Sequence, residues 1–136
     1  MQINTYLAFD GQCAQAFKFY ERVLGGKAEL LTHGESPMAD KVPAEWRDRI
    51  MHARLAVGQQ VLMGADSPPE YYEGNKGFSV SIGAEDTATA ERVFNALAEG
   101  GTVRMPLQKT FWAASFGMLI DRFGIPWMVN CEEKSR

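Results

Sequence analysis

The sequence predicts an α+β domain made of two copies of one strand–helix–strand–strand–strand module. Three observations support this prediction. Short segments of alternating apolar and polar residues surround two segments of helical periodicity, the order of elements in the first half recurs in the second, and a glycine pair follows each helix. The 136 residues suffice for one domain. We expect a single domain with module 1 at about 1–66, a linker at about 67–76 and module 2 at about 77–132.

The first module begins with a half-buried strand, because Leu7 and Phe9 alternate with polar or small residues from Ile3 onward. A helix is predicted where apolar residues recur at helical spacing, and Gly25 and Gly26 end it. The predicted elements are a strand at 3–9, a helix at 13–24 and strands at 27–32, 50–57 and 60–65. The polar, proline-containing segment 34–49 is predicted to be a long loop.

The second module repeats this order. The predicted elements are a strand at 78–82, a helix at 87–99 and strands at 102–107, 114–121 and 125–131. The halves are aligned by pairing Thr5, Leu7 and Phe9 with Phe78, Val80 and Ile82, Phe19 with Phe94, Gly25 and Gly26 with Gly100 and Gly101, and Met63 with Met128. An internal repeat of this kind sets the architecture before any motif is considered.

Composition excludes several classes of protein. The net charge is −3 and basic residues do not cluster, so a nucleic-acid partner is not expected. No segment has the roughly 20 apolar residues that span a bilayer, and no basic region precedes an apolar stretch at the N-terminus. Cys13 and Cys131 have neither zinc-binding nor CxxC spacing. We therefore expect a cytoplasmic protein without a membrane partner.

Three stretches carry a resemblance to a known family: YLAFDGQCAQAFKFYERVLGG, IMHARLAVGQQVLMGAD and TFWAASFGMLIDRFGIPWMVNC. With the tandem module order, they resemble the vicinal oxygen chelate superfamily, and more specifically its PhnB-like, demethylubiquinone methyltransferase-like branch. The resemblance covers nearly the whole chain. It implies curved mixed sheets that enclose a cavity, and a homodimer. Because that superfamily includes enzymes and binding proteins, the resemblance leaves the activity open.

Metal-using members of the superfamily hold their ion with four residues from the first and last strands of each module. The corresponding positions here are Asn4, Met63, Gly77 and Met128. Glycine offers no side chain and methionine only a soft thioether, whereas zinc, iron or manganese needs about three imidazole or carboxylate donors. We therefore expect no metal site and no cofactor. The alternative role for Met63 and Met128 is adaptable apolar packing.

His52 is the candidate catalytic residue. It shares a strand face with Arg54, opposite Ala53 and Leu55, so it is predicted to point toward a cavity or a dimer partner. An imidazole there can act as a general acid or base, or bind a ligand. No serine, cysteine or carboxylate is spaced to pair with it. The alternative is a histidine that completes a polar network on the sheet.

The predicted ligand pocket combines aromatic, polar and soft side chains on the inferred cavity faces. Its residues are Asn4, Tyr6, His52, Arg54, Met63, Ser79, Trp112, Phe116 and Met128. Trp46 in the long loop is a candidate lid. Trp127 and Cys131 are expected in the core, His33 in the loop and Cys13 at the start of a helix. The aromatic residues could equally fill core or interface.

Three functions remain open at this level. The first is a metal-independent small-molecule binding protein. The second is an isomerase, lyase or transferase that acts on a small apolar or aromatic substrate with His52 as acid or base. The third is an interaction protein whose pocket is vestigial. Methyl transfer from S-adenosylmethionine is not favoured, because no glycine-rich nucleotide loop follows a predicted strand.

Overall fold

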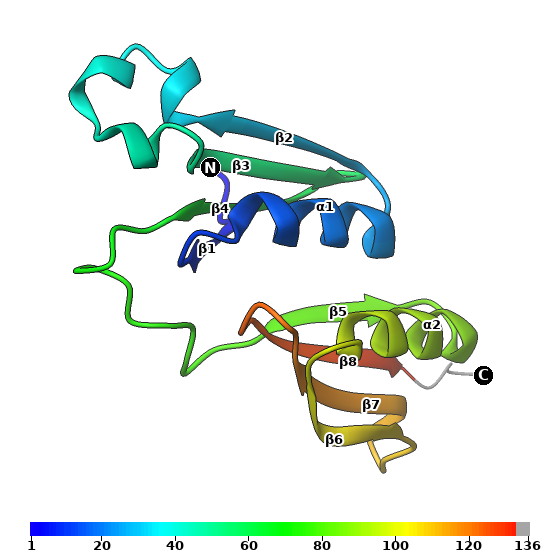
Figure 1. Ribbon diagram of the computed structural model, residues 1–136. Coiled ribbons are helices and arrows are strands. Elements are labelled where there is room, and N and C mark those ends of the chain that lie inside the picture. Colours follow the sequence, from blue (N-terminus) through cyan, green and yellow to red (C-terminus); the bar gives the residue numbers. More distant parts are fainter. Residues whose placement is uncertain (133–136) are drawn as a thin grey trace. The chain divides into compact units, whose positions relative to one another are not determined.

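The computed structural model describes residues 1–132 of the chain. The backbone forms two compact units, one at residues 1–74 and a second that begins at Asn75. Figure 1 shows that each unit consists of a four-stranded sheet with one α-helix against it. The predicted α+β fold with two modules of the same element order is confirmed.

The first unit contains β1 (Thr5–Phe9), α1 (Cys13–Leu24), β2 (Lys27–Thr32), β3 (Ile50–Val57) and β4 (Gln60–Asp66). Its strands lie in the order β1-β4-β3-β2, with β1 parallel to β4 and the other pairs antiparallel. The helix and the second and third strands have the predicted bounds. β1 starts two residues later than predicted, and β4 ends one residue later.

The core of the first unit lies between α1 and one face of this sheet. Phe17 and Tyr20 of α1 are fully buried, as are Leu7 of β1 and Leu55 of β3. Gly64 in β4 allows this close packing, because a Cβ atom there would lie 2.8 Å from Cε1 of Phe17. The opposite face of the sheet has no helix of this unit against it and is available for other contacts.

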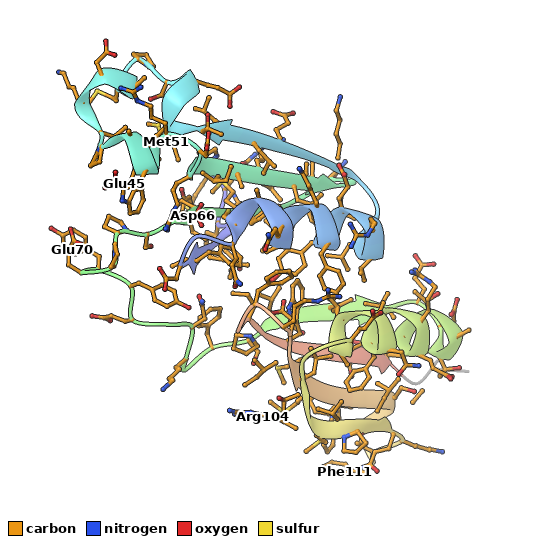
Figure 2. The ribbon with its side chains drawn as sticks, in the orientation of Figure 1. Glu45, Met51, Asp66, Glu70, Arg104 and Phe111 are labelled. Atoms are coloured by element: carbon orange, nitrogen blue, oxygen red, sulfur yellow. The ribbon has the colours of Figure 1, made fainter. Side chains whose placement is uncertain are left out.

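Asp66 connects the helix to the sheet. Its side chain is buried, Oδ1 accepts a hydrogen bond from the backbone N–H of Cys13 at 3.0 Å, and Oδ2 accepts one from that of Ile50 at 2.8 Å. Figure 2 shows Asp66 at the end of β4, close to where α1 begins. The carboxylate thus satisfies one N–H at the first turn of α1 and one at the start of β3.

The segment predicted as a long loop contains three short 3-10 helices, η1 (His33–Glu35), η2 (Ala39–Lys41) and η3 (Ala44–Trp46). A reciprocal capping box starts η1: the Thr32 hydroxyl accepts from the Glu35 N–H at 3.2 Å, and the Glu35 carboxylate accepts from the Thr32 N–H at 3.0 Å. Helices of three residues leave no apolar periodicity, so the sequence does not reveal them.

The second unit contains β5 (Val80–Ala84), α2 (Thr87–Ala98), β6 (Thr102–Gln108), β7 (Ala113–Ile120) and β8 (Pro126–Glu132). Its strand order is β5-β8-β7-β6, the same arrangement as in the first unit. Asp86 caps α2 by accepting from the N–H of Thr89 at 2.7 Å. Gly117 in β7 allows Phe94 of α2 to approach closely, as Gly64 does for Phe17. Trp127 and Cys131 are buried, as predicted.

The predicted alignment of the two first strands was wrong by two residues. Phe78 lies outside β5, and parallel pairing with β8 begins at Val80. Tyr6 pairs with Met63 in the first unit, and Ser81 pairs with Met128 in the second, so Tyr6 corresponds to Ser81. Alternation alone could not show this, because a shift of two residues keeps the same faces together.

Candidate functional site

The candidate site of the first unit is the sheet face opposite α1, which we call the open face. Residues paired across strands share a face, so the register places Tyr6, Met63, Arg54 and Glu29 in one row. His52 lies in the next row, paired with Leu31 of β2. The structure therefore brings together four predicted pocket residues: Tyr6, His52, Arg54 and Met63.

Tyr6 and His52 are in direct contact on this face. The Tyr6 hydroxyl oxygen lies 3.3 Å from Nδ1 of His52, and the ring centroids are 5.8 Å apart. When neutral His52 carries its proton on Nε2, the hydroxyl donates to Nδ1. Partial burial, with a smaller contribution from Cys13, raises the pKa of Tyr6 above its ordinary 10.0, so the phenol stays neutral at physiological pH.

The surroundings of this pair combine charge and apolar surface. Arg54 is exposed and Met63 is half-buried, and both belong to the row of Tyr6. Leu31 beside His52 is 39% exposed, and Tyr6 itself is 52% exposed. The open face thus offers a hydroxyl, an imidazole, a guanidinium and the exposed Glu29 carboxylate next to exposed apolar side chains, without a buried charge.

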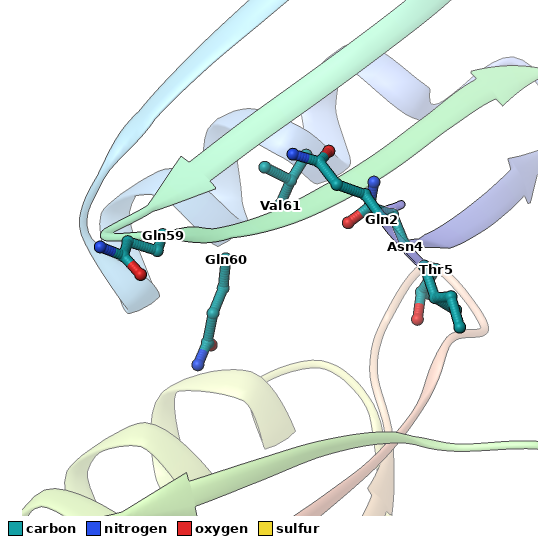
Figure 3. Close-up of a pocket in the computed structure, with 7 residues that line it drawn as sticks. Gln2, Asn4, Thr5, Gln59, Gln60 and Val61 are labelled. Atoms are coloured by element: carbon teal, nitrogen blue, oxygen red, sulfur yellow. The ribbon is translucent and has the colours of Figure 1, made fainter.

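Asn4 lies just before β1 and lines a separate hollow at the end of the same sheet (Figure 3). This hollow has a volume of about 330 Å³. Its lining residues are Gln2, Ile3, Asn4, Thr5, Gln59, Gln60 and Val61. It is rich in amides and contains no charged side chain, so it suits only neutral hydrogen-bonding groups.

The sheet of the second unit has a corresponding open face opposite α2. One row contains Ser81, Met128 and Met118, and the next contains Gly83, Asn130 and Phe116. Trp112, before β7, contacts Phe116 edge-on with centroids 5.5 Å apart. Phe111 contacts Trp112 at 4.7 Å and is 93% exposed; Figure 2 labels it between β6 and β7.

Of the predicted pocket residues in this unit, Met128, Phe116 and Trp112 lie on or beside the open face, and Ser79 directly precedes β5. Sequence reasoning missed Met118, Asn130 and Phe111. Asn130 could have been predicted, because alternate residues of a strand share a face and Asn130 lies two residues after Met128. Met118 is identified only by the pairing of β7 with β8, and Phe111 only by its ring contact with Trp112.

The four residues that the resemblance places at metal-ligand positions lie in different surroundings. Met63 pairs across the strands with Tyr6 and Arg54, and Met128 pairs with Ser81 and Met118, while Asn4 and Gly77 lie outside the strands. None of these cross-strand partners offers the imidazole or carboxylate donors that a divalent cation prefers. Within residues 1–132, no three His, Cys, Asp or Glu side chains gather in a group that could hold a metal ion.

The candidate lid residue Trp46 packs within its own segment. Its ring contacts His33 edge-on at 5.7 Å between centroids, and the Arg49 guanidinium carbon lies 4.9 Å from the ring centre. His33, predicted as a solvated loop residue, is half-buried in this contact. Trp46 is therefore held by two neighbours in the first unit.

Cys13 at the start of α1 is fully buried, and burial together with the Asp66 charge raises the pKa of its thiol far above the ordinary 9.0. The folded protein therefore keeps this proton more tightly than the unfolded chain does. The stability that this pKa difference contributes is fully present below about pH 9, and it is lost as the pH rises above the pKa of the thiol in the unfolded chain.

We expect the urea concentration at the midpoint of unfolding to be lower at about pH 10.5 than at about pH 8, and we expect this decrease to be smaller in Cys13→Ala. An equal decline in both proteins would contradict this.

No helix within the described part of the chain is long and apolar enough to cross a membrane.

Comparison with known proteins places these features in a family. The family model described as 3-demethylubiquinone-9 3-methyltransferase matches residues 1–130. Protein YjdN from Escherichia coli K12 is 35% identical, over 96% of this chain and 95% of that protein. The crystal structure of protein PA1353 from Pseudomonas aeruginosa is 57% identical, with a TM-score of 0.90 over 98% of this chain and 99% of that one.

More distant structures share the fold. A PhnB protein from Bacillus cereus is 23% identical with a TM-score of 0.78, over 96% of this chain and 99% of that one. The fold also occurs in glyoxalase/bleomycin resistance proteins. This chain therefore belongs to the family described as 3-demethylubiquinone-9 3-methyltransferase, the PhnB-like branch of the vicinal oxygen chelate fold.

Proposed function

We propose that this member of the glyoxalase/bleomycin-resistance-like superfamily is a small-molecule binding protein that works without a metal. The observation that carries the proposal is the contact between Tyr6 and His52 on the open face of the first unit, where a polar pair lies among exposed apolar residues. Sites for small molecules combine apolar surface with a few directed polar groups.

The chemistry of this face suits a small apolar or aromatic molecule that carries one polar group. The hydroxyl of Tyr6 and the imidazole of His52 supply a donor and an acceptor, and Arg54 supplies a positive charge. Met63 and Leu31 supply adaptable apolar contact. In the second unit, Trp112 and Phe116 supply aromatic surface on that unit's own open face, where Met128 also lies, and Ser79 directly precedes β5. Asn4 supplies an amide in the separate hollow of the first unit.

The proposal includes no cofactor. The donor set beside Met63 and Met128 does not fit a divalent cation, and the turn after β1, Asp10–Gly11–Gln12, lacks the repeated glycines of a nucleotide-binding loop. Membership of a family described as a methyltransferase therefore does not assign methyl transfer to this chain.

The alternative function is catalysis on the same face, with His52 as acid or base in an isomerase, lyase or transferase. The observation that favours it is the 3.3 Å separation between the Tyr6 hydroxyl and Nδ1, which would hold the imidazole in one orientation. If a substrate is turned over, His52→Ala should lower kcat at least a hundredfold. Full activity of that variant would exclude His52.

The test of the binding proposal is a screen of small aromatic and apolar compounds against protein treated with a chelator. For a ligand found this way, Tyr6→Phe should raise the Kd about three- to tenfold, because one hydrogen bond is worth about 0.5–1.5 kcal/mol. Tyr71→Phe is the matched control, since Tyr71 is 75% exposed and lies outside the open face. If the ligand has the same Kd for Tyr6→Phe as for Tyr71→Phe and wild type, the proposed site is contradicted.

We also propose that the two units fold as one domain, and that the protein works as a homodimer in the cytoplasm. Small size supports the single domain, since a unit of about half this chain buries little core. The positions of β1 and β5 at the edges of their sheets support self-association, and both cysteines are free thiols, as in a reducing compartment. Light scattering should give twice the chain mass of 15.1 kDa; the mass of a monomer would contradict the dimer.

A further inference from the structure

Asn130 in β8 has an amide oxygen that is buried without a hydrogen-bond partner. Val129 and Cys131 on either side of it are buried toward α2, so alternation places Asn130 on the open face of the second unit. Its Oδ1 is closed off from solvent and has no hydrogen-bond partner among the described residues. Such an orphaned acceptor is uncommon and destabilises the free protein.

The two neighbours of Asn130 in its row differ sharply. Phe116 lies on one side, in β7, and is 9% exposed. Gly83 lies on the other side, in β5, and no atom comes within 4 Å of the place that a Cβ would occupy there. Since neighbouring strands are about 4.8 Å apart, the space in front of Gly83 is one strand away from the amide.

The aromatic side of the row continues outward. Phe116 contacts Trp112, and Trp112 contacts Phe111, each pair edge-on. Trp112 and Phe111 are more than half exposed. In the two rows formed by Ser81, Met128 and Met118 and by Gly83, Asn130 and Phe116, no side chain is charged. These rows therefore present aromatic surface, an open space and one unused acceptor.

We propose that this part of the open face binds a neutral, planar aromatic ring that carries an N–H donor. The ring occupies the space in front of Gly83 and extends across the row toward Phe116, and its N–H donates to Oδ1 of Asn130. The terminal torsion of asparagine is soft, so the amide can turn toward Gly83 as the ring enters. This inference rests on the proposed binding function and names a ligand class for it.

The test compares indole with 1-methylindole, which has the same ring system without the N–H. Binding is measured by calorimetry and ligand-detected NMR on the whole chain. Wild type should bind indole about tenfold more tightly than 1-methylindole, Asn130→Leu should bind the two equally, and Gly83→Val should bind neither. Asn130→Leu removes the orphaned acceptor, so its melting temperature should equal or exceed that of wild type, which verifies folding.

Equal affinity of wild type for the two probes, or a preference that persists in Asn130→Leu, would overturn this inference. If indole fails to bind while the compound screen yields a ligand whose NMR shifts lie only on the Tyr6–His52 face, the inference fails and the proposed function stands. If no aromatic compound binds at all, both fail.

Discussion

Replacement of Asp121 by alanine should destabilise the protein by about 3–5 kcal/mol. Asp121 follows β7 and is 3% exposed. Its Oδ1 accepts from the N–H groups of Phe123 at 2.8 Å and Ile125 at 3.0 Å, and its Oδ2 accepts from Nε1 of Trp127 at 2.9 Å. Alanine would leave these three donors without their acceptor, two of them in buried residues. A typical domain is stable by only about 5–15 kcal/mol, so this is a large loss.

Urea unfolding followed by circular dichroism measures this effect. Asp121→Asn keeps one acceptor oxygen and should lose roughly half as much. Asp86→Ala is the control, because Asp86 is an exposed helix cap whose loss costs about 1 kcal/mol. If Asp121→Ala were no less stable than Asp86→Ala, the turn between β7 and β8 would not depend on the buried carboxylate.

Gly26→Ala should be destabilising by more than about 3 kcal/mol, while Gly25→Ala should cost about 1–2 kcal/mol. The two glycines after α1 have nearly the same φ, +79° for Gly25 and +83° for Gly26, so either alanine would adopt an unfavourable conformation. Only at Gly26 would the new Cβ collide with a backbone atom, the carbonyl oxygen of Ala56. The difference between the two variants therefore measures the collision alone.

The same urea experiment checks this pair. Similar losses in the two variants would mean that β3 can move away from Gly26 and that the close approach is not required. The second unit offers a related pair, in which a Cβ at Gly101 would meet the carbonyl oxygen of Ile120, whereas Gly100, which alone of the two has a positive φ of +75°, has the Arg122 side chain as its nearest contact. We expect Gly101→Ala to be the more damaging of that pair.

Most of the fold was predictable because its signals are local. Alternation around Leu7 and Phe9, helical spacing around Phe17 and Tyr20, and paired glycines all reflect burial against a near neighbour in the same module. The glycine pairs also show the limit of such signals. Sequence identifies them as helix ends, but it does not show that the second glycine of each pair lies against the backbone of Ala56 or Ile120.

The candidate site was less predictable, because it depends on register between strands that are far apart in sequence. Alternation places His52 and Arg54 on one face, but only the pairing of β1 with β4 puts Tyr6 beside Met63. The same limitation misaligned Phe78 with Thr5 and placed Gly77 among the candidate ligands. A neutral amide such as Asn130 carries no sequence signal of its own, since its role depends on the empty space at Gly83.

The central claim is that the open face around Tyr6 and His52 binds a small molecule without a metal. The most direct measurement is two-dimensional NMR of chelator-treated, tag-free protein titrated with the aromatic compound set. We expect saturable shifts of residues on this face, including Tyr6, His52 and Arg54, that are unchanged when zinc, nickel or manganese is added. Shifts that occur only after one of these metals is restored would contradict it.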